Sequence, residues 1–218
     1  MTPIVSNVPR RCCLVALGAI AVCGVSVTAV GLAGGAATAM GVACGPRAAR
    51  TLAHDAVARV YASGGNAYGC VVGRVGNVQL GAVALSPGRA HIVVVRVAGR
   101  IAGYGLLTSG VDTGVATVNV RRLTTGKLLV QRPATTRVGV EAFQSVESLV
   151  LKSDGAIAWI ATARSIGAPK FIRQVELLDG RAFRRLDSGP DVAASSLTLR
   201  GSRLSWKHGA STRTATLR

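Results

Sequence analysis

The sequence has few aromatic residues, few acidic residues and very little lysine. Aromatic residues make up 4% of the 218-residue chain, so an apolar core must be built mainly from Val, Leu, Ala and Ile. Only 9 acidic residues oppose 26 basic ones, four of which are lysine, and the formal net charge is +17. A surplus of that size attracts polyanions such as nucleic acid, anionic lipid headgroups or cell-wall polymers.

The basic residues do not form long runs. After residue 11, the only adjacent pairs are Arg121-Arg122 and Arg184-Arg185. No basic run with interleaved aromatic residues is present, so no specific nucleic-acid-binding motif is indicated. These four arginines are therefore the candidate anion-binding residues, and a generally basic surface without a dedicated site is the alternative.

The sequence lacks the motifs of metal and cofactor sites. His54, His91 and His208 are far apart and have no histidine at the spacing of a metal-binding pair. There is no G-x-S-x-G nucleophile elbow, no phosphate-binding loop and no dinucleotide fingerprint. We therefore predict no catalytic residue, no cofactor and no metal ion.

Acidic residues keep one enzymatic alternative open, because a facing pair of carboxylates can hydrolyse glycosidic bonds. The candidates are Asp112, Glu141, Glu147, Asp154, Glu176, Asp179, Asp187 and Asp191. Aspartate before glycine in a turn, as at Asp154 and Asp179, also has a purely structural role. We predict a non-catalytic binding or interaction module that contacts anionic envelope polymers or another protein, with a secreted hydrolase using loop carboxylates as the alternative.

The N-terminal segment has the pattern of an export signal. Arg10-Arg11 is followed by a stretch without charge up to Pro46, and Ala37-Thr38-Ala39 fits the small-x-small pattern of a signal-peptidase site. This predicts a signal peptide over residues 1–39 and a secreted or cell-envelope protein. An uncleaved membrane anchor is the alternative, and only then would the chain contact a membrane.

The cysteines agree with export. Three of the five lie in the predicted leader, which leaves Cys44 and Cys70 as an even pair in an oxidising compartment. We predict a disulfide between them. The alternative is lipidation of Cys44, because Gly41–Cys44 partly matches a lipobox.

Alternating apolar residues and glycine turns predict strands through most of the remaining chain. The clearest unit has four strands, His91–Val97, Ile101–Leu107, Val115–Leu123 and Leu128–Gln131. Similar units are expected before it and after Val146 and Ser195. We therefore expect a lead-in at 40–55 and a β-domain at 56–218.

The predicted units share one pattern: an apolar strand, a glycine turn, and a returning strand with an aromatic residue. It occurs in Val93–Tyr104, Ser148–Trp159 and Ser196–Trp206, and more loosely around Tyr68. The four aromatic residues are 36, 55 and 47 residues apart, a spacing typical of four-stranded propeller blades. We expect these aromatic side chains to lie in the core between units.

The segment Asn119–Lys127 resembles the hairpin signature D-L-x-T-G-K/R of WD-type and bacterial lipoprotein-type β-propellers, with Arg121 or Arg122 in place of the aspartate. A leader, a Cys…Tyr-Gly-Cys opening and blade-like units also resemble uncharacterised exported proteins of high-GC actinobacteria. The resemblance implies an architecture and no activity. The predicted fold is all-β, a propeller-like tandem of about four antiparallel meanders after an N-terminal signal helix. An N-terminal strand could close such a ring, and an open arc and an orthogonal β-sandwich are the alternatives.

Overall fold

The computed structural model describes residues 44–85, 88–110, 113–136, 142–165, 170–180 and 182–218. In these ranges the chain forms 15 strands and no helix, which confirms the all-β prediction. The described residues belong to one compact unit, Ala39–Arg218. The predicted signal peptide and its helix lie outside them. Among the described residues, no helix has the length and hydrophobicity that crossing a bilayer requires.

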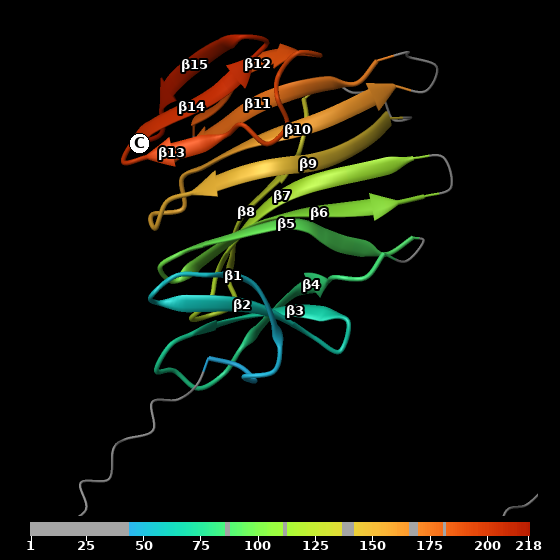
Figure 1. Cartoon of the computed structure of the whole chain (residues 1–218). Helices are drawn as coiled ribbons and strands as arrows, with labels where there is room; N and C mark the ends of the chain where they lie inside the picture. The colour runs from blue at the N-terminus through green and yellow to red at the C-terminus, as the bar shows by residue number, and fades with distance from the viewer. Residues whose placement is uncertain (1–43, 86–87, 111–112, 137–141, 166–169, 181) are drawn as a thin grey trace, which may run out of the picture. The chain divides into compact units, whose positions relative to one another are not determined.

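The strands form four antiparallel meanders that follow one another in the sequence (Figure 1). Meander 1 contains β1 (Arg50–His54), β2 (Ala58–Ser63), β3 (Asn66–Val71) and β4 (Val78–Ala82). Meander 2 contains β5 (Ala90–Ala98), β6 (Ile101–Ser109), β7 (Gly114–Arg122) and β8 (Leu128–Pro133). Meander 3 contains β9 (Ala142–Leu151), β10 (Ile157–Ser165), β11 (Ile172–Asp179) and β12 (Ala182–Gly189). Meander 4 has three strands, β13 (Thr198–Arg200), β14 (Arg203–His208) and β15 (Ser211–Thr216).

The predicted strands of meander 2 are confirmed to within two residues at each end. Other boundaries differ more. The strand predicted from Val146 begins at Ala142, and the one predicted from Ser195 begins at Thr198. The lead-in contributes the strand β1, which pairs with β2. Single parallel residue pairs, Ala82 with His91 and Gly114 with Phe143, connect the first three meanders.

The described residues contain no closed barrel and no closed propeller ring. In them, β1 pairs only with β2, and β15 pairs only with β14. An N-terminal strand that completes the last meander is therefore absent from the described part of the chain. Residues 1–43 lie outside it.

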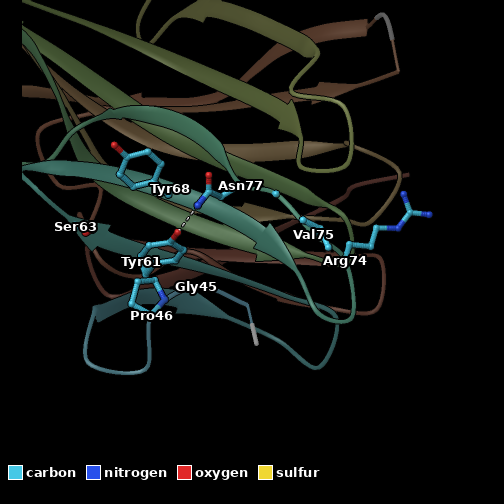
Figure 2. A pocket seen from close by; sticks show the side chains of 9 residues that line it. Gly45, Pro46, Tyr61, Ser63, Tyr68, Arg74, Val75 and Asn77 are labelled. Carbon is cyan, nitrogen blue, oxygen red and sulfur yellow. Dashed lines mark hydrogen bonds between the residues drawn. The ribbon is translucent and has the colours of Figure 1, made fainter. Parts of the chain in front are cut away.

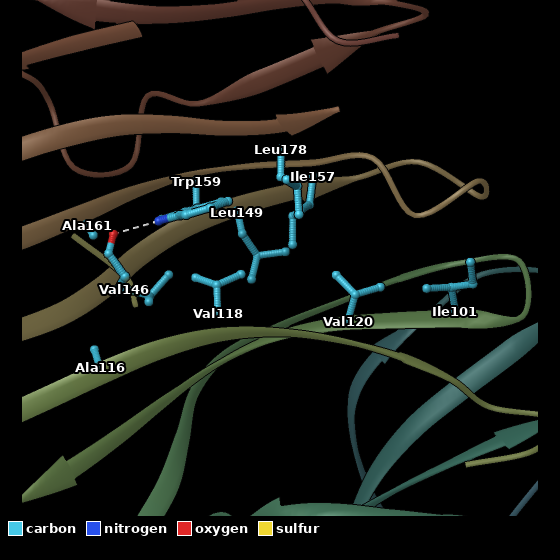
Figure 3. Close-up of a cluster of buried hydrophobic side chains, with 11 residues drawn as sticks. Ile101, Ala116, Val118, Val120, Val146, Leu149, Ile157, Trp159, Ala161 and Leu178 are labelled. Atoms are coloured by element: carbon cyan, nitrogen blue, oxygen red, sulfur yellow. Dashed lines mark hydrogen bonds between the residues drawn. The ribbon is translucent and has the colours of Figure 1, made fainter. Parts of the chain in front are cut away.

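Neighbouring meanders share an apolar core at each of three interfaces. Meanders 1 and 2 bury Val60, Leu80 and Tyr104 together with smaller residues. Meanders 2 and 3 bury a larger set around Trp159 (Figure 3), and meanders 3 and 4 bury a third set that includes Trp206. Removing such apolar surface from water is the main driving force that holds the meanders together.

Glycine in β6 permits close packing between meanders 2 and 3. A Cβ atom on Gly105 would lie 2.7 Å from Cβ of Val146, and one on Gly103 would lie 3.1 Å from Cδ1 of Ile157. Real carbon atoms do not approach as closely as the first of these distances. The two glycines therefore let the first strands of meander 3 lie directly against β6.

The aromatic residues occupy one equivalent position in the meanders. Tyr104, Trp159 and Trp206 lie on the second strand of meanders 2, 3 and 4, are buried, and pack in the core shared with the preceding meander. The prediction is confirmed for these three and wrong for Tyr68. Tyr68 is half-buried on β3, the third strand of meander 1, because the turn before it joins the second and third strands. The aromatic residue on the second strand of meander 1 is Tyr61, which points away from meander 2.

The outer face of meander 4, at one end of the described array, is polar. On meander 4, Leu204 and Trp206 point into the core, while the intervening side chains face outward. This outward face carries Thr198, Arg200, Arg203, Ser205, Lys207, Thr212, Thr214 and Thr216. A polar outer face is typical of the terminal units that cap repetitive arrays.

The opposite end is covered by the segment that a disulfide holds on meander 1. Cys44 and Cys70 are bonded, with a Cα–Cα distance of 5.4 Å. The guanidinium of Arg59 donates hydrogen bonds to the carbonyl oxygens of Cys44, Pro46 and Ala49. The disulfide indicates an oxidising compartment. It also occupies the sulfur atom of Cys44 to which a lipid would be attached.

Candidate functional site

The structure separates the four arginines predicted to bind anions into two pairs. Arg121 and Arg185 bond within the protein. Arg121 donates to the Tyr104 hydroxyl over 3.2 Å and to the Gly126 carbonyl over 2.6 Å. Arg185 bonds to the Glu176 carboxylate over 3.1 Å and to the Thr136 carbonyl over 2.9 Å. Arg122 and Arg184 are exposed and have no such partners among the described residues, whereas the exposed Arg185 is already bonded, so Arg122 and Arg184 remain the candidates to meet a ligand.

Arg122 and Arg184 lie at the edge where the hairpin turns of the meanders meet, which we name the turn rim. It comprises residues 99–100, 122–127, 152–156, 179–184, 200–203 and 216–218, apart from the undescribed residue 181. Lys152 donates to the Leu217 carbonyl over 3.5 Å, and the Leu217 N–H donates to the Ser202 carbonyl over 2.9 Å. The turns after β9 and β13 lie on one side of the sheets, near the C-terminus (Figure 1). Turns from meanders 2, 3 and 4 therefore form one surface.

Exposed basic residues gather on the turn rim. They are Arg100, Arg122, Lys127, Arg184, Arg200, Arg203 and Arg218. The ion pairs among the described residues involve Lys152, Arg185, His208 and Arg213, and none of the seven. Arg200 and Arg203 face each other across β13 and β14. Like charges directly opposite each other destabilise a strand pair. The rim thus presents positive charges that no carboxylate of the described protein neutralises by direct contact.

The acidic residues of the rim bond to groups of the rim itself. Asp154 accepts from the Ala156 N–H over 2.9 Å and pairs with Lys152 over 3.5 Å. Asp179 accepts from the Arg218 N–H over 2.8 Å. These carboxylates therefore position backbone, which leaves the exposed arginines as the groups that an external anion would meet.

Two open cavities lie on the rim and share Arg218. One has a volume of about 450 Å³ and is lined by Arg122, Asp154 and Arg218 together with backbone and apolar groups. The other has a volume of about 700 Å³ and is lined by Asp179, Arg184, Thr216 and Arg218. Each cavity therefore combines arginines from different parts of the array with at most one carboxylate.

The candidate catalytic carboxylates do not converge. Glu176 and Asp187 are the two buried ones, and they lie on opposite faces of meander 3. Glu176 contacts Thr136 at the end of meander 2, whereas Asp187 contacts Trp206 in meander 4. Asp112 and Glu141 lie outside the described residues. None of five cavities on the described surface is lined by two carboxylates.

Asp187 joins meander 3 to meander 4. Its carboxylate accepts a hydrogen bond from Nε1 of Trp206 over 2.7 Å, contacts Nδ1 of His208 over 3.0 Å and pairs with Arg213 over 2.5 Å. Burial alone would raise the pKa of Asp187, but the hydrogen bonds from Trp206, His208 and the Ser188 N–H outweigh it and lower the pKa. The ionised carboxylate is therefore a structural link.

Glu176 gives the protein a pH-dependent stability. Burial raises the pKa of its carboxyl above the ordinary value. The charge of Arg185 and the hydrogen bonds from Arg185 and Thr136 lower the pKa, but burial has the larger effect. A raised folded-state pKa favours the folded state most at low pH, and this contribution is lost as pH rises from about 4.3 through the folded-state pKa. We expect Glu176→Gln to flatten the fall in unfolding free energy over that range, measured by urea titrations at several pH values. An unchanged pH profile would contradict this assignment.

The histidines do not gather into a metal site. His54 is exposed on β1, His91 is buried on β5 and His208 lies against Asp187. Among the described residues, no three His, Cys, Asp or Glu side chains lie close enough together to hold a metal ion.

A third cavity, of about 460 Å³, lies on the outer face of meander 1 (Figure 2). Tyr61, Tyr68 and Asn77 line it, and the Asn77 side-chain amide donates to the Tyr61 hydroxyl over 2.8 Å. Sequence analysis did not single out this group, because its members come from two strands and a loop.

No protein-family model, curated protein or solved structure matches the chain. The basic rim residues that sequence analysis missed are Arg100, Lys127, Arg200, Arg203 and Arg218. The signal for Arg100, Arg200 and Arg203 was present, because each flanks the glycine turn of an aligned unit, as in Gly99-Arg100 and Arg200-Gly201-Ser202-Arg203.

Proposed function

We propose that this protein is an exported, non-catalytic binding module that holds anionic polymers of the cell envelope on its turn rim. The observation that carries the proposal is the set of seven exposed basic residues on one edge, none of which has a carboxylate partner among the described residues. The disulfide supports an extracellular or envelope location, since such bonds persist in oxidising compartments.

An extended polymer suits the rim better than a small anion. The basic residues lie on turns of three meanders, so one small ligand would reach few of them at a time. A chain with repeated phosphate or carboxylate groups can contact many weak sites together, which raises affinity without any deep pocket. The cavities around Arg218 would then receive individual anionic groups of the bound chain.

We also propose that the meanders are repeated units of a propeller-like array. Three apolar interfaces between successive meanders support this arrangement over a sandwich, in which two sheets share a single core. In such an array the turns of successive units fall on a common edge, which explains how separate hairpins build one binding rim.

Removing rim arginines should weaken polymer binding and its salt dependence. We expect the triple variant Arg122→Ala, Arg184→Ala, Arg218→Ala to bind long-chain polyphosphate more weakly at low salt. The slope of log K against log salt concentration should fall by about 0.7–0.9 for each contact removed, because each contact releases a counterion. Affinity measured by fluorescence anisotropy at several salt concentrations checks this.

The matched control removes the same charge elsewhere. Arg89, Arg132 and Lys170 are exposed and lie outside the turn rim. The triple alanine variant of these residues has the same net charge as the rim variant, and we expect it to retain most of the affinity. Equal losses in the two variants would show a generally basic surface without a dedicated site. An affinity that does not change with salt concentration, or no binding at all, would refute the proposed function.

A further inference from the structure

The outer face of meander 1 has an aromatic position without a meander to pack against. Tyr104, Trp159 and Trp206 each fill the core shared with the preceding meander. In meander 1 the aromatic residue of the second strand, β2, is Tyr61. The core shared with meander 2 contains Ala58 and Val60 of β2 but not Tyr61. Tyr61 therefore points to the opposite face, where the described chain supplies the segment after Cys44 and the loop at residues 74–77.

Tyr61 is held in a fixed orientation there. It is 2% exposed, and its hydroxyl accepts a hydrogen bond from the Asn77 side chain over 2.8 Å. The backbone of Gly45 lies against its ring, because a Cβ atom on Gly45 would come within 2.3 Å of Cε1. The Arg59 guanidinium lies 5.4 Å from the ring centroid. Tyr61 thus forms the rigid base of the cavity.

Tyr68 forms the accessible wall of the same cavity. Its ring stacks on that of Tyr61, with centroids 5.8 Å apart and an angle of 27° between the planes (Figure 2). Tyr68 is half-buried, and among the described residues its hydroxyl makes no hydrogen bond. A tyrosine held in place by a second ring offers an apolar surface and a free hydroxyl at little cost in conformational entropy.

Groups with several hydrogen-bonding options surround the two rings. Ser63 and Asn77 line the cavity. Asn77 bonds to Tyr61 through its amide nitrogen, which leaves its side-chain oxygen to accept from a ligand. Arg74 also lines the cavity, but its guanidinium extends away from the two rings (Figure 2). Val75 in the neighbouring loop is 91% exposed, which adds apolar surface at the cavity. The lining has no carboxylate and a single cation, so it is not built for a strongly charged ligand.

We propose that this cavity binds an uncharged pyranose unit of a polysaccharide. A sugar ring presents C–H groups on one face, which pack on an aromatic ring, and hydroxyls around its edge, which need donors and acceptors. Tyr68 would take the apolar face, while Asn77 and Ser63 bond to the hydroxyls. Residues 74–77 border turn-rim residues 123–125, but Tyr68 and Ser63 lie outside the rim, and the site does not depend on the proposed binding of polyanions.

Titration with neutral oligosaccharides tests the site. The probes are the trimer of β-1,4-linked N-acetylglucosamine and the trimer of α-1,4-linked glucose, added to the secreted ¹⁵N-labelled protein up to about 10 mM, a concentration that detects millimolar affinity. We expect saturable shifts of the backbone amides of Tyr68 and residues 74–77 with at least one trimer. No saturable shift with either trimer, or shifts confined to other meanders, would overturn the proposal.

Variants separate stacking from charge. Tyr68→Ala should weaken binding about tenfold or more, whereas Tyr68→Phe keeps the ring and should stay within about threefold of the wild type. Tyr68 is half-buried, so its loss should leave the fold intact, which the unchanged amide spectrum of meanders 2–4 would verify. The triple rim variant should bind the trimer as the wild type does. Sugar affinity that survives Tyr68→Ala would refute stacking, whatever the polyanion experiments show.

Discussion

Trp159→Ala is expected to lower the free energy of unfolding by about 3–5 kcal/mol, as large truncations in a packed core do. The Trp159 side chain is fully buried between meanders 2 and 3 (Figure 3). Its Nε1 donates to the Ala134 carbonyl over 2.7 Å, and its ring stacks on Phe183 with centroids 6.0 Å apart. The substitution therefore removes apolar contacts and leaves a buried carbonyl without its partner. Urea unfolding measures the change.

Two further variants separate these effects. Trp159→Phe retains most of the apolar area but loses the donor, and we expect a loss of about 1–3 kcal/mol from the unsatisfied carbonyl. Val115→Ala on β7 is the control, because Val115 is 49% exposed and its truncation should change stability by no more than about 0.5 kcal/mol. If Trp159→Ala cost no more than Val115→Ala, meanders 2 and 3 would not share the core described above.

Loss of the disulfide is expected to be nearly as costly. The bond between Cys44 and Cys70 spans a sequence separation of 26 residues, and the chain-entropy model assigns such a loop about 3–4 kcal/mol. The double variant Cys44→Ser, Cys70→Ser should therefore unfold at lower denaturant concentration. Hydrogen exchange should accelerate in residues 44–49, which the bond and Arg59 hold on meander 1.

Reduction of the wild-type protein provides the matched comparison. Because Cys44 and Cys70 are the cysteines of the unit Ala39–Arg218, reduction should reproduce the destabilisation of the double variant. The serine variant itself should show no further change with reductant. Equal stability of reduced and oxidised wild-type protein would contradict a structural role for the bond.

The strands of the described part could be predicted well because their signals are local. In β5 to β8, apolar alternation indicates the strands, and the turns at Gly99 and Gly126 define one end of each. The disulfide could also be predicted, because only one pair remained after the predicted leader. The all-β class follows from the same signals.

Tyr68 shows why the site was harder to predict than the strands. Its local sequence fits the aromatic pattern of Tyr104, yet the turn before it joins a different pair of strands, and spacing alone does not reveal this. Arg121 and Arg122 are adjacent in sequence, but neighbouring strand residues point to opposite faces, so one bonds internally and the other is exposed. The partners of Asp187 lie 19 to 26 residues away and are brought to it only by tertiary packing.

The most direct test of the account is a hydrogen-exchange footprint of the secreted protein with and without polyphosphate. The account predicts slower exchange in the turns at 99–100, 122–127, 152–156 and 200–203, with little change near Ser109 and Ser165 at the other ends of β6 and β10. Protection spread evenly over the surface, or concentrated away from these turns, would contradict a polymer-binding rim.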